Sequence, residues 1–467
     1  MYSEAPVSGN RSKGHLLRIL GVSFGIAVIV GGTIGSGILL TPGEIAAQLR
    51  NPWLIFAVWS MGGVFAFFCT LSVTELGTML PQDGGWFVFS RRAFGDYGGF
   101  LVGCCDWMMQ VGAIAYLGAA FGEFAADFEP GWRGHEKLLA AACLLVLMFL
   151  NWLGLRTGSR AQEITSLIKA LGLLALVAAC FVFSPKSIPV DTAAPRSLLQ
   201  LPLAAVLTAM IAALQPIIAT YDGWYGAIYF SEEDKDPVRD LPRSSIIGVL
   251  ACAAIFLLVN AALVHVLSSG GLAASRMPAA DAAQLIFGAH GRTVILLISL
   301  VTVISTINAC LLITPRILFG MGRDGLMPGW MTHVNSGGTP SVGLLLCTGL
   351  SIALVLSGSF DTIVAMTAIL YVAVYLSGFA SLFVLRVREP DLPRPFKMWG
   401  YPWTNLGISL GAGAFLVAAI IGDLKHALFT LVVIALTYPL YRLMKKMRSV
   451  REPGGTAIPA IHGAEDT

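Results

Sequence analysis

Residues Gly31 to Leu40 read GGTIGSGILL and lie inside an apolar segment that is otherwise long enough to cross a membrane. Four of the first seven residues of this stretch are glycine, and Thr33 and Ser36 stand among them. A glycine inside a helix costs about 1 kcal/mol relative to alanine, and each backbone group left unpaired in hydrocarbon costs several kcal/mol more. The pattern therefore predicts a helix that breaks within the membrane.

The composition is that of an integral membrane protein. Of the 467 residues, 56% are hydrophobic and 12% are charged, whereas soluble domains carry about 25% charged residues. We place twelve apolar segments between residues 19 and 443, each near the length of a bilayer-spanning helix. The short alternating strands of a membrane barrel are not seen in the sequence. We therefore predict an all-α polytopic membrane protein with twelve transmembrane helices.

The basic residues predict the orientation. If the N-terminus is cytoplasmic, most of the lysine and arginine residues fall in cytoplasmic segments, as the positive-inside rule requires. No cleavable signal peptide is apparent, because the apolar run from Ile19 continues past Leu40. We expect both termini in the cytoplasm, and the short loops favour a bacterial inner membrane.

A second break is predicted in the sixth apolar segment. Pro216 removes a helix hydrogen bond, and Asp222-Gly223 is a favoured turn sequence. The apolar pattern resumes at Trp224. Because the two broken segments are five helices apart, we predict two inverted five-helix repeats, each beginning with a discontinuous helix. The expected boundaries are a tail at 1–18, repeats at 19–184 and 201–385, two further helices at 403–443, and a tail at 444–467.

Two facing breaks favour a binding site for a zwitterion. The N-terminal end of a half-helix presents unpaired N–H groups and about half a positive charge, which attract a carboxylate. The carbonyl groups at the end of the other half-helix attract an ammonium. An α-amino acid carries both groups. The competing interpretation, glycines that serve close helix packing, would account for a single pair of glycines but not for two breaks that lie five helices apart.

Four ordered motifs resemble the amino acid–polyamine–organocation superfamily, and specifically its L-amino-acid-transporter branch. They are GGTIGSGILLTP (31–42), TELGTMLPQDGGWFVFSRRAFG (74–95), TYDGWYGAIYFSEEDKDPVRDLPRS (220–244) and STINACLLITPRILFGMGRDGLMP (305–328). The resemblance covers nearly the whole chain and implies a LeuT-type fold.

The resemblance also implies site residues. The substrate carboxylate would lie on N–H groups of Ser36 and Gly37, beside Gly35, and the ammonium would meet carbonyl groups of both breaks. The implied substrate-binding set is Thr33, Ile34, Gly35, Ser36, Gly37, Ala219, Thr220, Tyr221 and Asp222. Members usually carry a bulky aromatic gate where this chain has Ala219, and many carry Glu where it has Trp86. Alanine at this position leaves room for a larger side chain.

Lys169 is a charged residue within the apolar fifth segment, EITSLIKALGLLAL (163–176). A charge at such depth is costly and marks a functional candidate, although snorkelling to the surface is the alternative. Relatives carry a lysine here, whose ammonium takes the place of a sodium ion and bridges helices one and five. The resemblance therefore implies sodium-independent transport, with Lys169 as a fixed tether or a proton carrier.

Other ionisable residues are expected to be structural or interfacial. We expect Glu75 to be structural near the cytoplasmic end, Asp106 and Glu123 to be interfacial, and Arg316 to be structural. The stretch from Glu232 to Arg243 predicts a solvated loop. Pairing of this loop with Arg91 and Arg92 would make an inner gate.

We expect no cofactor, no metal site, no enzymatic activity and, from a net charge of +3, no nucleic-acid partner. The segment DFEPGWRGHEK (127–137) contains no cysteine. In the family a disulfide-linked ancillary subunit attaches through a cysteine of this loop, so none is expected here. The leading hypothesis is sodium-independent exchange or facilitated transport of L-amino acids. Three alternatives remain: proton-coupled symport, a nutrient sensor, and a polyamine or amine permease. For the last of these, Asp222 is the candidate acid.

Overall fold

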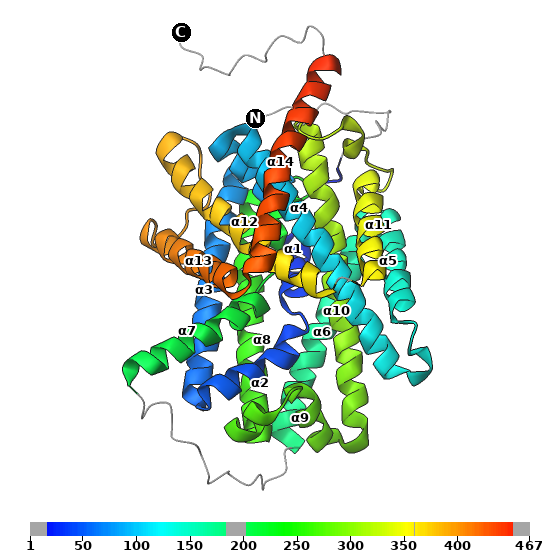
Figure 1. Cartoon of the computed structure of the whole chain (residues 1–467), viewed down its shortest axis with the longest axis vertical. Helices are drawn as coiled ribbons and strands as arrows, with labels where there is room; N and C mark the ends of the chain where they lie inside the picture. Colours follow the sequence, from blue (N-terminus) through cyan, green and yellow to red (C-terminus); the bar gives the residue numbers. More distant parts are fainter. Residues whose placement is uncertain (1–15, 184–201, 359, 452–467) are drawn as a thin grey trace.

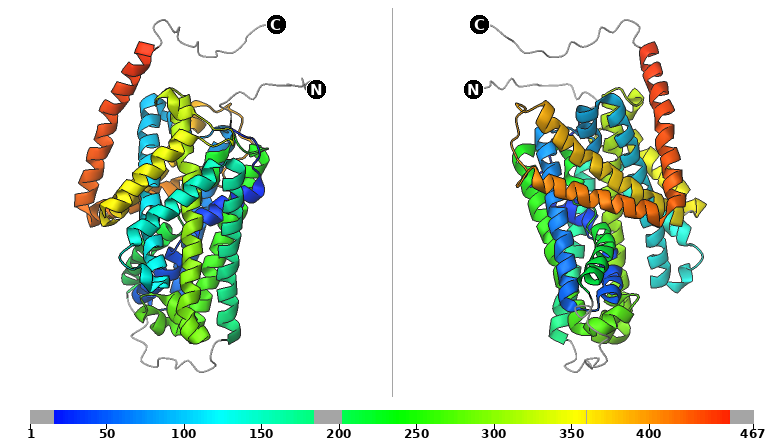
Figure 2. Two further views of the ribbon diagram at one scale, coloured as in Figure 1. Left: turned by 90° about the vertical axis from the view of Figure 1, so that its right-hand side faces the viewer. Right: turned by 60° about the vertical axis from the view of Figure 1, so that its left-hand side comes forward.

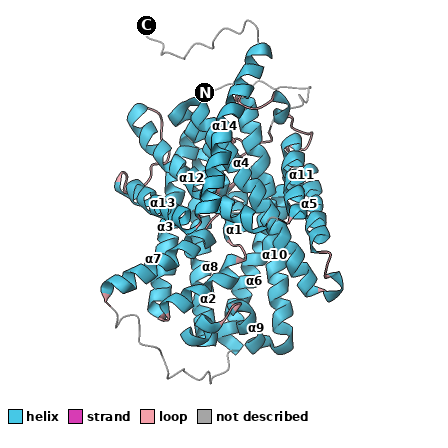
Figure 3. Cartoon of the chain, viewed as in Figure 1, coloured by secondary structure: helices cyan, strands magenta, loops and turns pink. Residues whose placement is uncertain are grey.

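The computed structural model describes residues 16–183, 202–358 and 360–451. Nearly all of them are helical, and the helices form a bundle that is elongated along one axis (Figures 1 and 3). The predicted boundaries at residues 184 and 201 lie outside the described residues. The same holds for the outer parts of the two predicted tails, residues 1–15 and 452–467. The helices are α1 (Val22–Thr33), α2 (Gly37–Leu49), α3 (Pro52–Met79), α4 (Trp86–Phe128), α5 (Glu136–Trp152), α6 (Leu155–Phe183), α7 (Leu203–Thr220), α8 (Pro237–Ala274), α9 (Pro278–Phe287), α10 (Gly291–Arg323), α11 (Ser341–Ser357), α12 (Phe360–Arg388), α13 (Trp403–Gly422) and α14 (Leu424–Arg451).

The helices account for the predicted spans. Within the described residues, nine helical segments are long and apolar enough to cross a membrane, and α1 with α2 forms a bent pair that makes a tenth. The helices α5 and α11 have 17 residues each, which is the lower limit for a bilayer-spanning helix. The predicted all-helical membrane fold is confirmed. The short helix α9 was not predicted, and α14 continues as far as Arg451, beyond the expected end of its span (Figure 2).

The glycine-rich stretch is a break between two helices. The first helix, α1, ends at Thr33, and α2 begins at Gly37 after a bend of 48°. The bend directs α2 away from the axis of α1 in Figure 1. The first predicted discontinuous helix is therefore present at the predicted place.

The second break differs in detail from the prediction. Pro216 lies inside α7 without ending it, and the helix ends at Thr220. Turns follow, and the apolar pattern from Trp224 forms a short 3-10 helix, η3 (Gly226–Phe230), instead of an α-helix. The turn depends on Gly223, whose φ of +108° is a conformation that side chains with a Cβ rarely adopt.

The two breaks are in direct contact. A Cβ added at Gly223 would lie 2.5 Å from the carbonyl carbon of Gly32. The backbones of the two broken segments therefore pack against each other without a side chain between them. This close approach places the unpaired backbone groups of both breaks at one point inside the bundle.

Two buried carboxylates hold other helices together. Glu75 of α3 is fully buried and accepts hydrogen bonds from both Nε and Nη2 of Arg386 in α12, at 2.8 and 2.7 Å. Its Oε2 also accepts from the backbone N–H of Met398 at 2.7 Å, which bears out the structural role. The prediction for Asp106 is wrong, because this residue is fully buried in α4 and accepts hydrogen bonds from the Tyr229 hydroxyl.

Replacement of Glu75 by Gln is expected to destabilise the fold by about 3 kcal/mol, because the partly buried guanidinium of Arg386 loses its counter-charge. The measurement is thermal unfolding of the detergent-purified protein. Glu389→Gln is the matched control, since Glu389 pairs with the exposed Arg92 and surface pairs contribute little. Equal melting temperatures for the two variants would contradict the structural role of Glu75.

Candidate functional site

A cavity of about 430 Å³ lies where the two breaks meet. This volume is in the usual range for small-molecule sites. The walls come from α1, α2, α7 and the turn after it, together with α3, α4, α10, α12 and α13. The cavity is therefore built around the two segments that the sequence singled out.

The structure brings seven of the nine predicted substrate-binding residues to the cavity wall. These seven are Thr33, Gly35, Ser36, Gly37, Ala219, Thr220 and Asp222. Ile34 and Tyr221 do not line it. The Ile34 side chain is fully buried, and the Tyr221 hydroxyl points to α3, where it donates to the Trp59 carbonyl at 3.1 Å. Each break turns one of its motif residues away from the cavity, which a motif alone does not predict.

The N-terminus of α2 faces the cavity. Its first N–H groups, beginning at Gly37, have no partner within the helix, and they carry the positive end of the helix dipole. The hydroxyl groups of Thr41 and Thr220 are 3.1 Å apart and connect α2 to α7. A Cβ at Gly37 would lie 3.2 Å from the Thr220 hydroxyl, so glycine keeps this helix end open. The arrangement can bind an anionic group.

Lys169 lies at the break of α1. Its Nζ donates hydrogen bonds to the carbonyl oxygens of Gly31 and Ile34, each at 2.7 Å, and its side chain is 1% exposed. The ammonium of α6 therefore caps the C-terminal end of α1, where the break begins, and does not reach the surface. The Ile34 carbonyl, predicted to meet the substrate ammonium, already accepts from Lys169.

A buried polar network supports this region of α1. Ser166 and Gln162 of α6 donate to the carbonyl oxygen of Ala27, at 2.7 and 3.3 Å. Asn308 of α10 donates to Gln162 Oε1 at 2.8 Å, and the Thr306 hydroxyl is 3.0 Å from the Gly31 carbonyl. Side chains of α6 and α10 therefore satisfy carbonyl groups along α1 and fix its position.

Aromatic residues pack together beside the second break. The Tyr375 hydroxyl of α12 donates to Asp222 Oδ1. Trp86 packs against Trp224, Tyr225 and Tyr375, with ring centroids 5.5 to 6.0 Å apart. Sequence reasoning missed the lining residues on α4, α10 and α12, among them Gln110, Tyr116, Thr306, Cys310, Tyr371 and Tyr375. The apolar pattern of a membrane helix does not mark which face lines a cavity.

The cavity extends past Ala219. Phe65 of α3 and Ala412 and Phe415 of α13 line it together with Ala219 and Ile218 of α7. A bulky residue in place of Ala219 would project from the same wall into this space. The small side chain is therefore consistent with an enlarged end of the cavity.

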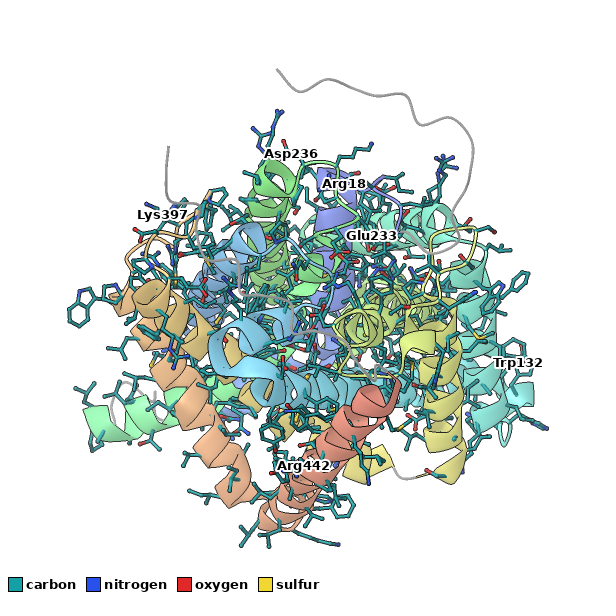
Figure 4. The ribbon with its side chains drawn as sticks, turned by 90° about the horizontal axis from the view of Figure 1, so that it is seen from above. Arg18, Trp132, Glu233, Asp236, Lys397 and Arg442 are labelled. Atoms are coloured by element: carbon teal, nitrogen blue, oxygen red, sulfur yellow. The ribbon has the colours of Figure 1, made fainter. Side chains whose placement is uncertain are left out.

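One end of the bundle is closed by charged groups and backbone contacts. Arg316 and Glu233 are buried and joined by two hydrogen bonds of 2.6 and 2.9 Å, and Arg323 pairs with Glu232. Leu20 pairs with the chain around Asp234 through backbone bonds of 2.9 and 3.1 Å. Figure 4, a view onto this end, shows Arg18, Glu233 and Asp236 near one another. These contacts join α10 to the segments that precede α1 and follow η3.

The predicted partners of this loop are wrong. Arg91 pairs with Asp96 and Asp324, and Arg92 pairs with Glu389. The acidic residues 232 and 233 instead meet arginines of α10, because η3 ends beside that helix. In the loop after α3, burial and the neighbouring Glu233 raise the pKa of Asp83, despite the opposing effect of Arg316.

These features define a polytopic membrane protein with a small-molecule cavity between two broken helices. The model of the amino acid permease family matches residues 20–440, so the chain belongs to this family. It is 25% identical over 442 residues to a serine/threonine exchanger of Bacillus subtilis, covering 93% of this chain and 98% of the relative. It is also similar to the mouse b(0,+)-type amino acid transporter 1 (26% identical; 82% of this chain and 79% of the relative) and to the human large neutral amino acids transporter small subunit 2 (27% identical; 84% and 75%).

Replacement of Lys169 by Met is expected to abolish transport and to lower stability by about 1–3 kcal/mol, because the buried carbonyls of Gly31 and Ile34 each lose a charged hydrogen-bond donor. Transport in proteoliposomes and thermal unfolding are the measurements. Lys137→Met is the control, since exposed Lys137 also donates to a carbonyl, that of Leu356. Wild-type transport by the Lys169→Met variant would exclude a role for the ammonium.

Proposed function

We propose that this protein carries L-amino acids across the membrane by alternating access, as a sodium-independent exchanger or facilitated transporter. The observation that carries the proposal is the meeting of the two breaks at one cavity, with the N-terminus of α2 on its wall. Membership of a permease family and similarity to amino acid transporters and exchangers support it.

The substrate's head group fits the backbone of the breaks. The carboxylate would lie at the N-terminus of α2, near Ser36 and Gly37, where N–H groups and the helix dipole favour an anion. The ammonium would face the C-terminal ends of α1 and α7, near Thr33, Ala219 and Thr220. The side chain would extend past Ala219 toward Phe65 and Phe415, which line the same cavity.

Lys169 supports independence from sodium. A sodium ion at the break of α1 would need oxygen ligands such as the carbonyls of Gly31 and Ile34, and both accept hydrogen bonds from the ammonium. A fixed positive charge at the same point also repels a second cation. The protein would then move its substrate along a substrate gradient or in exchange for another amino acid.

The closed end supports an orientation. Arg18, Lys235 and the helix ends that hold Arg91, Arg323 and Arg386 belong to the segments that the positive-inside rule places in the cytoplasm. The ion pair between Arg316 and Glu233 would then seal the cytoplasmic side, and the cavity would face outward. We expect the chain to work in a bacterial inner membrane without an ancillary subunit.

Counterflow in proteoliposomes tests the proposal. Vesicles loaded with one unlabelled amino acid should accumulate labelled substrate above the level of empty vesicles, equally with and without sodium. A panel of small, bulky and charged L-amino acids identifies the substrate. Failure of every α-amino acid to accelerate uptake would overturn amino acid transport, and strong sodium dependence would overturn the role given to Lys169.

Cys310 gives a second test of the binding site. Its side chain belongs to the cavity wall, so a small thiol reagent that enters the cavity should modify it. A bound amino acid should slow this modification several-fold, as followed by mass spectrometry of the labelled peptide. Cys69, which is fully buried in α3 outside the cavity lining, is the internal control and should stay unmodified with or without the amino acid.

A further inference from the structure

The cavity wall contains an acidic side chain whose charge no basic residue offsets. Asp222 follows the end of α7, and its carboxylate accepts a hydrogen bond from Tyr375. Among the residues that the structure describes, the ion pairs do not include Asp222. Of the described residues that line the cavity, none is Lys, Arg or His.

The groups that face Asp222 carry no positive charge. They are Tyr375 and Tyr371 of α12, Tyr116 of α4, Cys310 of α10 and Tyr225 of the turn after α7. Lys169 does not supply the missing charge, because it is engaged with the carbonyls of Gly31 and Ile34 and lies outside the cavity lining. An ionised Asp222 in the empty cavity would therefore stand without a cation.

An uncompensated carboxylate at membrane depth is costly. Two species can remove the cost: a proton, or the cationic group of a bound substrate. Asp222 stands at the C-terminal end of α7, the end at which helix carbonyls favour a cation. A substrate whose carboxylate binds the N-terminus of α2 turns its ammonium toward this end.

We propose that the Asp222 carboxyl holds a proton in the empty carrier and gives it up when the ammonium of the substrate binds. The inference rests on the proposed binding of amino acids at this cavity. On binding, the O–H bond of the carboxyl breaks, the proton leaves to water on the open side, and the carboxylate pairs with the ammonium. After release on the other side, the carboxylate takes a proton from that side. When the carrier returns empty, it therefore carries one proton in the direction opposite to that of the substrate.

Proton release on binding tests this inference. Purified protein in weak buffer with a pH-indicator dye is mixed with L-threonine, L-leucine or L-lysine, whichever supports counterflow. The wild type should release about one proton per bound substrate, and its affinity should rise about tenfold per pH unit where the empty site is protonated. In the Asp222→Asn variant, proton release should disappear and the affinity should become independent of pH.

Asp106→Asn is the matched control. Asp106 is also a buried carboxyl, hydrogen-bonded to the Tyr229 hydroxyl at 2.8 and 2.9 Å, but it does not line the cavity. This variant should release protons as the wild type does. Loss of release in Asp106→Asn, with release retained in Asp222→Asn, would overturn the assignment.

Tyr375→Phe covers the case in which Asp222→Asn does not fold. It keeps the carboxyl and removes its hydrogen-bond donor, so release should persist while the pH of half-maximal release shifts. An unchanged pH profile would show that the proton does not come from Asp222. Wild-type binding without proton release would overturn this inference alone, whereas failure of all amino acids to bind would overturn the proposed function.

Discussion

The hydrogen bonds from Lys169 to the C-terminal end of α1, at the break, are the interaction on which the rest of the structure depends. Hydrocarbon offers no partner to a freed carbonyl, so a helix can break in the membrane only where the protein supplies donors. The ammonium of α6 supplies two, to Gly31 and Ile34. Ser166 and Gln162 donate to the carbonyl of Ala27 in α1, and Thr306 is a second donor to that of Gly31. The break is thus stabilised from one side, which leaves the other side open to the cavity.

The sequence predicts the fold class and the two breaks for physical reasons. Four glycines in seven residues cannot form a stable helix at membrane depth without compensation, and Asp222-Gly223 is a turn sequence in any setting. These signals are local, so they can be recognised in the sequence without knowledge of the tertiary structure. The same holds for Lys169, because a charge within an apolar segment needs a partner wherever that partner lies.

What the sequence does not predict depends on contacts between distant helices. From the sequence, Asp106 is expected at the membrane interface. In the structure, η3 places Tyr229 beside it, and the Tyr229 hydroxyl donates to its buried carboxylate. Arg316 and Glu233 are 83 positions apart, and no local pattern pairs them. The side-chain end of the cavity is the largest omission, since Phe65, Tyr371 and Phe415 are ordinary apolar or aromatic residues of membrane helices. Which face of each helix turns inward is decided by packing.

The contribution of α13 to the cavity has a consequence for symmetry. In the proposed architecture the two five-helix repeats exchange roles as the carrier turns from one side of the membrane to the other. Ala412 and Phe415 belong to a helix outside both repeats, so the wall that they form has no symmetry-related counterpart. The substrate's head group would meet equivalent half-helices in both states, but its side chain would not meet equivalent surroundings. Such a carrier binds the same molecule unequally on its two faces.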